Sequence, residues 1–295
     1  MKLQILTSVW GQHHVDLFIN TTLRSLTFLN NQEALRQTEA VWNIFTNEES
    51  MYELERAVTH HHPSVTLKLR SKKDLRAYID PVQASVIWQI EECLKTDSRL
   101  LIAPPDTIFG DNSVHNLLTI GREKGSVVVV PHPRVLPTFV TEFNQNLDKY
   151  QPNHMLVSLA WKHLHRSWSE AKRGCVNQSS YIGGVEWDYL SHNLYSVTHR
   201  LPSPYLIDFT EEDLQYFKSA ISFGHFDHMW PGDILIPRGR QRFVGSSDAV
   251  FICEVTDADK NVPPVIDNQP SEGFWRNHVH NQHNAQIRCI FRGEP

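Results

Sequence analysis

Two carboxylates follow a short apolar stretch in the segment LLIAPPDTIFGDNS, residues 100–113. The apolar residues 100–103 predict a buried strand, which Pro104 and Pro105 end. Hard divalent cations bind carboxylate oxygens and bridge phosphate oxygens. No helix begins at Asp106, so we expect this side chain to face a ligand. Asp111 has two open roles, a ligand-facing one and an N-cap of the helix predicted over 114–120.

Another carboxylate that could take part in catalysis lies in the segment GHFDHMWPGD. Asp227 stands between His225 and His228, close to Trp230, and aromatic faces beside a carboxylate suit sugar stacking and base catalysis. A turn capped by Asp227 explains the same residues. Asp248, which precedes an apolar run, is expected to be a turn residue.

The chain has 17 histidines, so a histidine metal site needs consideration. Consecutive residues cannot place three imidazoles on one helix face, and the run at 60–62 therefore predicts a solvated turn. His278, His280 and His283 lie in a polar stretch typical of a surface. His199 follows a predicted strand and is a candidate metal ligand or phosphate contact.

Composition limits the class of protein. The formal net charge of -5 argues against a general nucleic-acid binder. Two basic segments, 68–76 and 237–243, favour a solvated surface, and the alternative is contact with a diphosphate or a phosphate-bearing acceptor. The four cysteines lack CxxC spacing, and no apolar stretch approaches the roughly 18 residues of a membrane span. These features predict a cytoplasmic protein.

Strands and helices that alternate must position the candidate residues. Apolar runs predict strands over 3–9, 41–45, 65–69, 100–103 and 127–130, with helices of 3.6-residue periodicity between them. Such alternation is typical of an α/β protein with a parallel sheet that helices cover on both faces. Ligands bind such sheets at the carboxyl ends of the strands. The residues expected at these ends are Thr7, Ser8, Trp10, Thr46 and Asp106.

The pattern beyond residue 135 is less regular. We expect a helix over 156–168, strands over 187–198, 233–236 and 250–255, and an extended excursion over 257–272. The chain therefore predicts a donor-binding half, 1–135, and an acceptor-binding or catalytic half, 136–295, within one continuous domain. It lacks the GxGxxG signature of dinucleotide sites and the GxxxxGK[ST] signature of P-loops.

Several segments resemble bacterial and phage glycosyltransferase-like proteins of the GT-A fold. They are TSVWG, LLIAPPDTIFGDNS, VVVVPHPRV, LAWKHLH, THRLPSP, GHFDH and GSSDAVFICEV. The resemblance implies a nucleotide-sugar donor on the N-terminal sheet and a divalent metal, Mn or Mg, on a DxD-type motif after the fourth strand. Asp106 matches the last acid of that motif, usually the metal ligand, whereas Pro104 stands in place of the first.

The resulting expectation is a metal-assisted glycosyltransferase that moves a sugar from a nucleoside-diphosphate sugar to a hydroxyl acceptor. Thr7, Ser8, Trp10 and Thr46 would line the nucleoside pocket. Asp106 and His199 would hold the metal, Arg134 would lie near the diphosphate, and Asp227 would act as base. The acceptor class stays open and includes glycans and a hydroxylated base of phage-type DNA. Two alternatives remain, a non-catalytic nucleotide-sugar or glycan binding module and a histidine-based metal hydrolase.

Overall fold

The computed structural model describes residues 1–61, 64–75, 81–172, 185–199, 203–220, 239–258 and 287–294. The chain forms two compact units: Met1–Val128 with Pro204–Phe226, and Val129–Ser203 with Asp227–Pro295. The first unit thus includes a segment from beyond residue 203, which a single boundary at residue 135 does not describe. The assignment of donor and acceptor halves stays a prediction.

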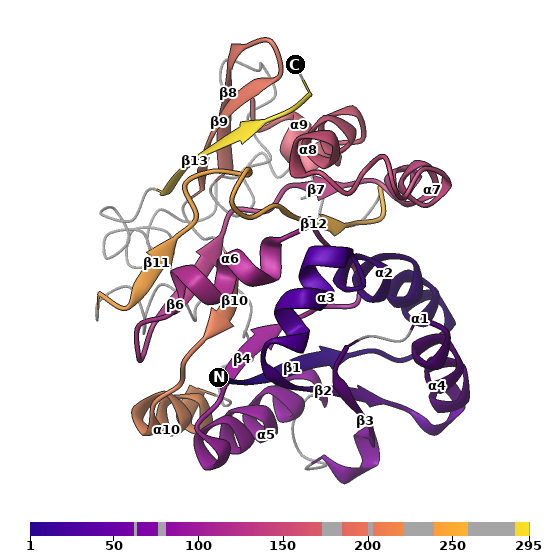
Figure 1. Cartoon of the computed structure of the whole chain (residues 1–295), viewed down its shortest axis with the longest axis vertical. Coiled ribbons are helices and arrows are strands. Elements are labelled where there is room, and N and C mark those ends of the chain that lie inside the picture. Colours follow the sequence, from indigo (N-terminus) through magenta and orange to yellow (C-terminus); the bar gives the residue numbers. More distant parts are fainter. Residues whose placement is uncertain are drawn as a thin grey trace, which may run out of the picture. The chain divides into compact units, whose positions relative to one another are not determined.

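The largest sheet has seven strands in the order β11-β6-β10-β4-β1-β2-β3 (Figure 1). β1 runs parallel to β2 and β4, β2 runs parallel to β3, and β10 runs antiparallel to β4. The predicted α/β class with a mostly parallel sheet is confirmed, and so are the five predicted strands. The strand bounds are β1 (Lys2–Ser8), β2 (Glu39–Thr46), β3 (Thr66–Ser71), β4 (Arg99–Ile102), β6 (Val127–Val130), β10 (Ser203–Ile207) and β11 (Gln241–Phe243).

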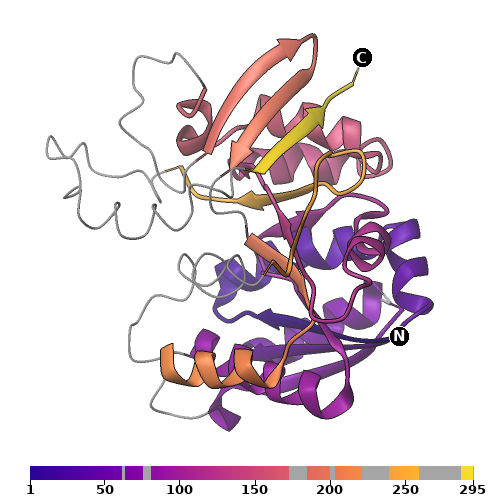
Figure 2. The ribbon, with the colours of Figure 1, turned by 90° about the vertical axis from the view of Figure 1, so that its left-hand side faces the viewer.

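Helices and short elements of the first unit connect these strands. β1 is buried along almost its whole length, and such a strand needs cover on both faces. α10 packs against α5, where Lys218 Nζ lies 2.8 Å from Glu91 Oε1 (Figures 1 and 2). The remaining bounds are α1 (Gln12–Phe18), the π-helical turn η1 (Ile19–Leu23), α2 (Arg24–Leu26), α3 (Leu29–Arg36), α4 (Glu48–His61), the 3₁₀ turn η2 (Lys72–Asp74), α5 (Pro81–Thr96), β5 (Thr107–Phe109), α6 (Ser113–Ile120) and α10 (Glu211–Ala220).

In its described residues, the second unit combines three helices with short strands. β8 and β9 form an antiparallel hairpin, β13 pairs antiparallel with β9, and β12 runs parallel to β7. α8 packs against β13 and β7. The bounds are β7 (Arg134–Val135), α7 (Thr138–Gln145), α8 (Asn153–Lys162), α9 (Arg166–Ser169), β8 (Val185–Ser191), β9 (Leu194–His199), β12 (Ile252–Val255) and β13 (Ile287–Arg292).

Three sequence predictions differ from the structure. The helix expected over 156–168 ends at Lys162, because Leu164 forms a β-bridge with Val135, and α9 begins only at Arg166. The strand expected over 187–198 is a hairpin that turns at Asn193, whose φ is +55°. The histidine run at 60–62 was expected in a turn, but His60 and His61 belong to the last turn of α4. The strand expected over 233–236 lies outside the described residues.

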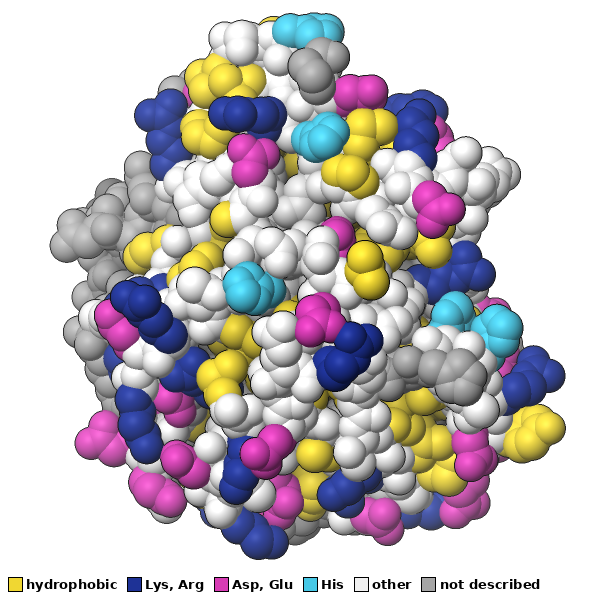
Figure 3. Space-filling view, viewed as in Figure 1, with side chains coloured by type: hydrophobic (Ala, Val, Ile, Leu, Met, Phe, Trp, Pro, Cys, Tyr) yellow, Lys and Arg dark blue, Asp and Glu magenta, His cyan; other side chains and the backbone are white. Residues whose placement is uncertain are grey.

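Charged side chains are mixed on the face drawn in Figure 3. Basic and acidic groups alternate over its lower part, and the described side chains on this face form no extended area of one sign. Nucleic-acid binders usually present a basic stripe or patch. The side chains of the first basic segment do not share one exposed surface along β3, because Lys68 is exposed and Arg70 is half-buried.

Gly11 ends the turn between β1 and α1 with a φ of +81° and a ψ of 140°. Side chains with a Cβ rarely adopt this conformation, although no atom would lie within 4 Å of a Cβ at this position. We therefore expect Gly11→Ala to lower the free energy of unfolding by about 1–3 kcal/mol, through backbone strain alone.

Gly245 offers the matched control. It also leaves open space around an added Cβ, but its φ lies outside the left-handed range. Gly245→Ala should therefore change the free energy of unfolding by less than about 0.5 kcal/mol. Urea denaturation of both variants measures the difference, and equal effects of the two substitutions would contradict the assignment of strain to Gly11.

Candidate functional site

The parallel strands β1, β2, β3 and β4 end at one edge of the sheet. Ser8 pairs with Phe45, and Thr46 pairs with Ser71, so the last residues of β1, β2 and β3 lie at a similar level. The amide of Ala103, just after β4, donates to the carbonyl of Leu6 on β1 at 2.9 Å. This carboxyl edge is where α/β sheets bind ligands.

The hydroxyl of Thr7 is already engaged inside the first unit. Thr7 is almost fully buried, and its Oγ1 donates to the carbonyl of Ala103 at 2.7 Å. The same oxygen accepts from Trp42 Nε1 at 3.0 Å. Thr7 thereby links β1, β2 and the start of the acidic loop, so its hydroxyl positions backbone at the edge.

Three other predicted donor residues lie at or beside the carboxyl edge. The Ser8 hydroxyl lies 2.6 Å from the hydroxyl of Ser85 on α5. Thr46 is fully buried, and its Oγ1 has no hydrogen-bond partner among the described residues. Trp10 is half-buried, and Lys72 Nζ lies 5.3 Å from the centre of its ring. Lys72 comes from the first basic segment and adds a positive charge here.

Helix N-termini meet the same edge because each crossover helix starts where a parallel strand ends. α1 follows β1 and α4 follows β2, and the contact of Ser85 with Ser8 brings the start of α5 to this edge. Asn47 caps α4, since its Oδ1 accepts from the amide of Ser50 at 3.2 Å. α4 carries two acids in its first turn, whereas α1 and α5 carry none. The partial positive charge of a helix N-terminus favours anions.

Two threonines of η1 hold the backbone around Asp106, which is half-buried in the turn between β4 and β5. The Thr22 hydroxyl lies 2.6 Å from the carbonyl oxygen of Pro104 and 2.8 Å from that of Thr107, and it accepts from the Thr107 amide at 3.2 Å. The Thr21 hydroxyl lies 2.9 Å from the carbonyl oxygen of Pro105. Both threonines are fully buried. The turn is therefore anchored on each side of Asp106.

The rest of the acidic loop is held by the same helical segment. Ser25 Oγ accepts from the amide of Phe109 at 3.0 Å. Asn31 Nδ2 donates to the carbonyl of Gly110, and its Oδ1 accepts from the amide of Val114, both at 3.0 Å. Ser25 and Asn31 are fully buried. Sequence reasoning missed these anchors, although a stripe of small polar residues on an apolar helical face was a visible signal.

Asp111 has a role that neither open alternative described. Its carboxylate accepts from the amide of Asn30 at 3.1 Å and from Asn30 Nδ2 at 2.5 Å. Asn30 lies in the first turn of α3, so Asp111 caps that helix from a distant part of the chain. α6 instead begins after Asn112, whose side chain makes no capping hydrogen bond.

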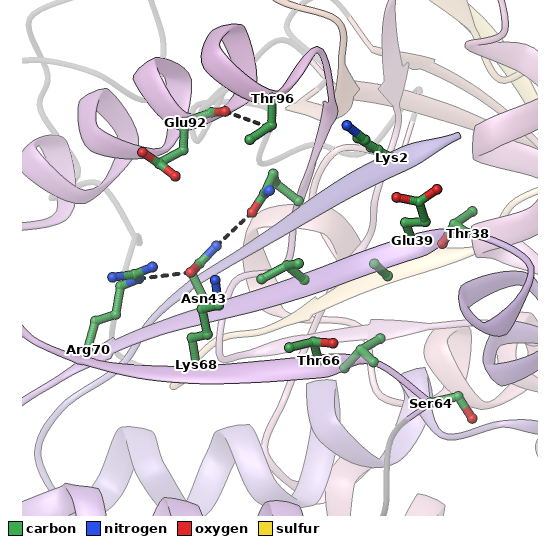
Figure 4. A pocket seen from close by; sticks show the side chains of 14 residues that line it. Lys2, Thr38, Glu39, Asn43, Ser64, Thr66, Lys68, Arg70, Glu92 and Thr96 are labelled. Atoms are coloured by element: carbon green, nitrogen blue, oxygen red, sulfur yellow. Dashed lines mark hydrogen bonds between the residues drawn. The ribbon is translucent and has the colours of Figure 1, made fainter.

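A polar groove of about 580 Å³ lies on the face of β1, β2 and β3 beside α5 (Figure 4). Hydrogen bonds cross the strands here: Arg70 Nε donates to Asn43 Oδ1 at 2.8 Å, and Asn43 Nδ2 donates to Gln4 Oε1 at 2.9 Å. Arg70 also stacks 4.1 Å from the ring centre of Trp88, and burial lowers its pKa. None of the predicted site residues lines this groove. It is a separate feature of the first unit.

The predicted residues of the second unit are spread over different elements. Arg134 Nε lies 3.3 Å from Glu254 Oε1, and His132 Nε2 lies 3.3 Å from Glu254 Oε2. Burial alone would raise the pKa of Glu254, but the His132 hydrogen bond and the Arg134 charge outweigh it, and the pKa is lowered. The Arg134 charge is thus balanced by a carboxylate. Asp248 is exposed in a turn, 3.8 Å from Arg292 Nε.

The other candidates can be placed only in part. His199 is the last residue of β9, where its backbone pairs with Val185 and Ile287. The described residues contain no group of three His, Cys, Asp or Glu side chains that could hold a metal ion. Asp106 therefore stands as a single candidate ligand. Outside the described residues lie Asp227, His225, His228, Trp230, His278, His280 and His283.

No protein-family model matches the chain, and no curated protein matches it. Among solved structures, it is similar to a protein from Bacillus anthracis described as a glucose-1-phosphate thymidylyltransferase (10% identity, 82% of this chain and 85% of that chain, TM-score 0.40). It is also similar to 4-diphosphocytidyl-2C-methyl-D-erythritol synthase from Anaerococcus prevotii (7% identity, 96% of this chain and 95% of that chain, TM-score 0.39). Mouse xyloside xylosyltransferase 1 is a further match (13% identity, 50% of this chain and 60% of that chain, TM-score 0.35). These identities and TM-scores are too low to transfer a function. The helices of the described part include none with the length and apolar character to span a membrane.

Proposed function

We propose that the chain is a metal-assisted glycosyltransferase that takes its sugar from a nucleoside-diphosphate sugar in the cytoplasm. The proposal rests on the segments that resemble GT-A glycosyltransferase-like proteins and on the chemistry at the carboxyl edge of the first unit. The donor would lie over Ser8 and Trp10, with its diphosphate near the N-termini of α1 and α5. Lys72 adds a charge that suits a diphosphate.

The anchored turn around Asp106 carries the proposal. Two fully buried threonines bind the backbone on both sides of Asp106. A carboxylate held in this way keeps its position when a ligand arrives, and little ordering entropy remains to be lost on binding. The π-helical turn that supplies both threonines is a local irregularity frequent at functional sites.

The remaining roles follow from the sequence. Asp106 would hold a Mn or Mg ion, which when bound offsets the negative charge of the leaving diphosphate. Asp227 would take the proton of the acceptor hydroxyl in an inverting reaction. The secondary candidates His225, His228 and Trp230 would surround the acceptor. Acceptors of this chemistry are hydroxyl groups of a glycan or of a modified base.

A non-catalytic nucleotide-sugar binding module is the second candidate. Pro104 in place of the first acid of the DxD-type motif favours it, because that acid is missing from the donor contacts. Release of free nucleoside diphosphate from a donor sugar in the presence of Mn distinguishes the two candidates, since a binding module releases none.

Donor binding should raise the melting temperature in a metal-dependent way. We expect one of UDP-, GDP-, ADP- and CMP-sugars to stabilise the protein more with Mn or Mg than with EDTA. A ligand that binds only the native state contributes about 2.7 kcal/mol at a hundredfold excess over its Kd. Thermal-shift measurements with each donor test this. An equal shift with EDTA removes the metal from the proposal, and no shift with any donor contradicts donor binding.

A further inference from the structure

A second groove, of about 490 Å³, lies entirely within the second unit. Its walls include residues of α8, residues of the β8–β9 hairpin, and Glu294, which lies just beyond β13. Four aromatic side chains dominate the lining, and this groove shares no residue with the carboxyl-edge site. The four are Trp161, Trp187, Tyr189 and Tyr195.

The aromatic rings form one packed cluster. The Trp161 and Tyr195 rings stack with centroids 4.3 Å apart and planes at 21°. Trp187 meets both rings edge to face, at 6.1 and 5.8 Å, and Tyr189 lies 5.7 Å from Tyr195. Tyr189 is nevertheless 51% exposed, which is a large exposed aromatic area for a residue in a packed cluster. The cluster is therefore partly open to a ligand, through the exposed ring of Tyr189.

Polar groups border the rings. The Ser158 hydroxyl accepts from the Glu294 amide at 2.6 Å, and Asn193 Nδ2 donates to the Glu294 carbonyl. Trp161 Nε1 is shielded from solvent and has no hydrogen-bond partner in the described part of the chain. A buried N–H without a partner is unfavourable, and an acceptor oxygen close to it would satisfy it.

The charges at this groove nearly cancel. Lys162 Nζ lies 2.6 Å from Glu142 Oε2, and hydrogen bonds from Lys162 and His163 hold the pKa of Glu142 near about 2. The Glu142 carboxylate therefore stays ionised at neutral pH and balances Lys162. Lys172, whose Nζ lies 5.7 Å from the centre of the Trp187 ring, and Glu294 each bring one formal charge, of opposite sign, to the same lining.

We propose that this aromatic groove binds a neutral oligosaccharide. A pyranose has a face of C–H groups with partial positive charge, which stacks on the negative face of an aromatic ring, and its equatorial hydroxyls bond polar groups at the ring edge. Single-stranded nucleic acid also stacks on aromatic rings, but its affinity depends on several cations that neutralise phosphates. The lining has only two cationic side chains, Lys162 and Lys172, and the first is paired with Glu142, so it does not meet that need.

This inference deepens the proposed function: if the chain is a glycosyltransferase, a glycan bound in this groove would make its acceptor a carbohydrate. The acceptor assignment therefore rests on the proposed function. Binding itself requires neither donor nor metal. A titration with oligosaccharide alone therefore tests the groove, whereas the donor thermal shift tests the proposed function. Either result can fail while the other succeeds.

The experiment titrates the full chain with neutral hexasaccharides of glucose, mannose and N-acetylglucosamine and follows tryptophan fluorescence, to which Trp161 and Trp187 contribute. We expect saturable binding of one of them. Tyr189→Ala should weaken that binding about tenfold through the loss of one stacking face, whereas Tyr189→Phe, which keeps the ring, should bind within about threefold of the unchanged chain. Tyr189 is half-exposed, so the melting temperature should change little in both variants.

Tyr52→Ala is the matched control, since Tyr52 is a 75% exposed tyrosine of the first unit. It should leave oligosaccharide binding unchanged. Three outcomes overturn the proposal: no binding of any hexasaccharide up to its solubility limit, equal binding by the chain with and without Tyr189→Ala, or tight binding of single-stranded DNA that Tyr189→Ala weakens in place of oligosaccharide binding.

Discussion

Asp106→Asn should reduce turnover of the nucleotide-sugar donor by about 10²–10³-fold and remove the metal-dependent part of donor binding. Asparagine keeps the size and hydrogen-bonding capacity of aspartate but lacks the charge that a hard cation needs. Metal stabilisation of a leaving group contributes several kcal/mol, and each 1.36 kcal/mol is about a factor of ten in rate. Release of nucleoside diphosphate measures turnover, and thermal shift with Mn or EDTA measures donor binding.

Asp111→Asn is the matched control for this prediction. It makes the same change five residues later in the same loop, at a carboxylate that caps α3 through Asn30. Asparagine still accepts from the Asn30 amide but loses the second interaction, so we expect a stability loss of about 0.5–1.5 kcal/mol and nearly unchanged turnover. Full metal-dependent binding and turnover in Asp106→Asn would show that the Pro-Pro-Asp segment is only a turn.

Thr22→Val should lower the free energy of unfolding by about 2–4 kcal/mol. Valine has almost the same shape as threonine but removes the hydroxyl, whose one proton is shared between the Pro104 and Thr107 carbonyls and whose oxygen accepts from the Thr107 amide. Each buried polar group left without a partner costs about 1–3 kcal/mol, and the substitution removes one donated and one accepted hydrogen bond. Urea denaturation measures the loss.

Two controls separate the lost hydroxyl from other effects of the substitution. Thr22→Ser keeps the hydroxyl and should lose only about 1 kcal/mol for the buried methyl group. Thr38→Val makes the same chemical change at a half-buried threonine whose hydroxyl donates only to the carbonyl of Leu35, so its effect should be about 1 kcal/mol or less. Donor binding by folded Thr22→Val should also weaken, because Asp106 is no longer held. An effect of Thr22→Val equal to that of Thr38→Val would contradict the anchoring role.

The strands of the first unit were predictable because their signals are local. Four consecutive valines at 127–130 are all buried in β6, and the alternation of apolar strands with helices specified a parallel sheet. The helix beyond Lys162 was not predictable, because Leu164 leaves helical periodicity to pair with Val135, 29 positions earlier. The hairpin was also not predicted. It turns at Asn193, which adopts a positive φ, but the apolar residues on both sides of it suggested one continuous strand.

The candidate site divides in the same way. Strand ends placed Ser8, Trp10 and Thr46 at the carboxyl edge, since that follows from parallel strands alone. The engagement of Thr7 with Trp42 and Ala103 was invisible, because these partners lie 35 and 96 residues away. The spacing of residues predicts which residue types share an edge of the sheet. It does not predict which hydroxyl groups already form hydrogen bonds inside the packed protein.

By itself the sequence determined that a strand ends in two prolines and that a carboxylate follows at the carboxyl edge of the sheet. Both follow from short-range rules of proline geometry and apolar patterning. Only the tertiary structure decided that Thr21 and Thr22 hold that turn, that Asp111 caps α3, and that four aromatic side chains meet in one groove. The physical reason is that these contacts join segments far apart in the chain, and packing of whole elements selects which side chains meet.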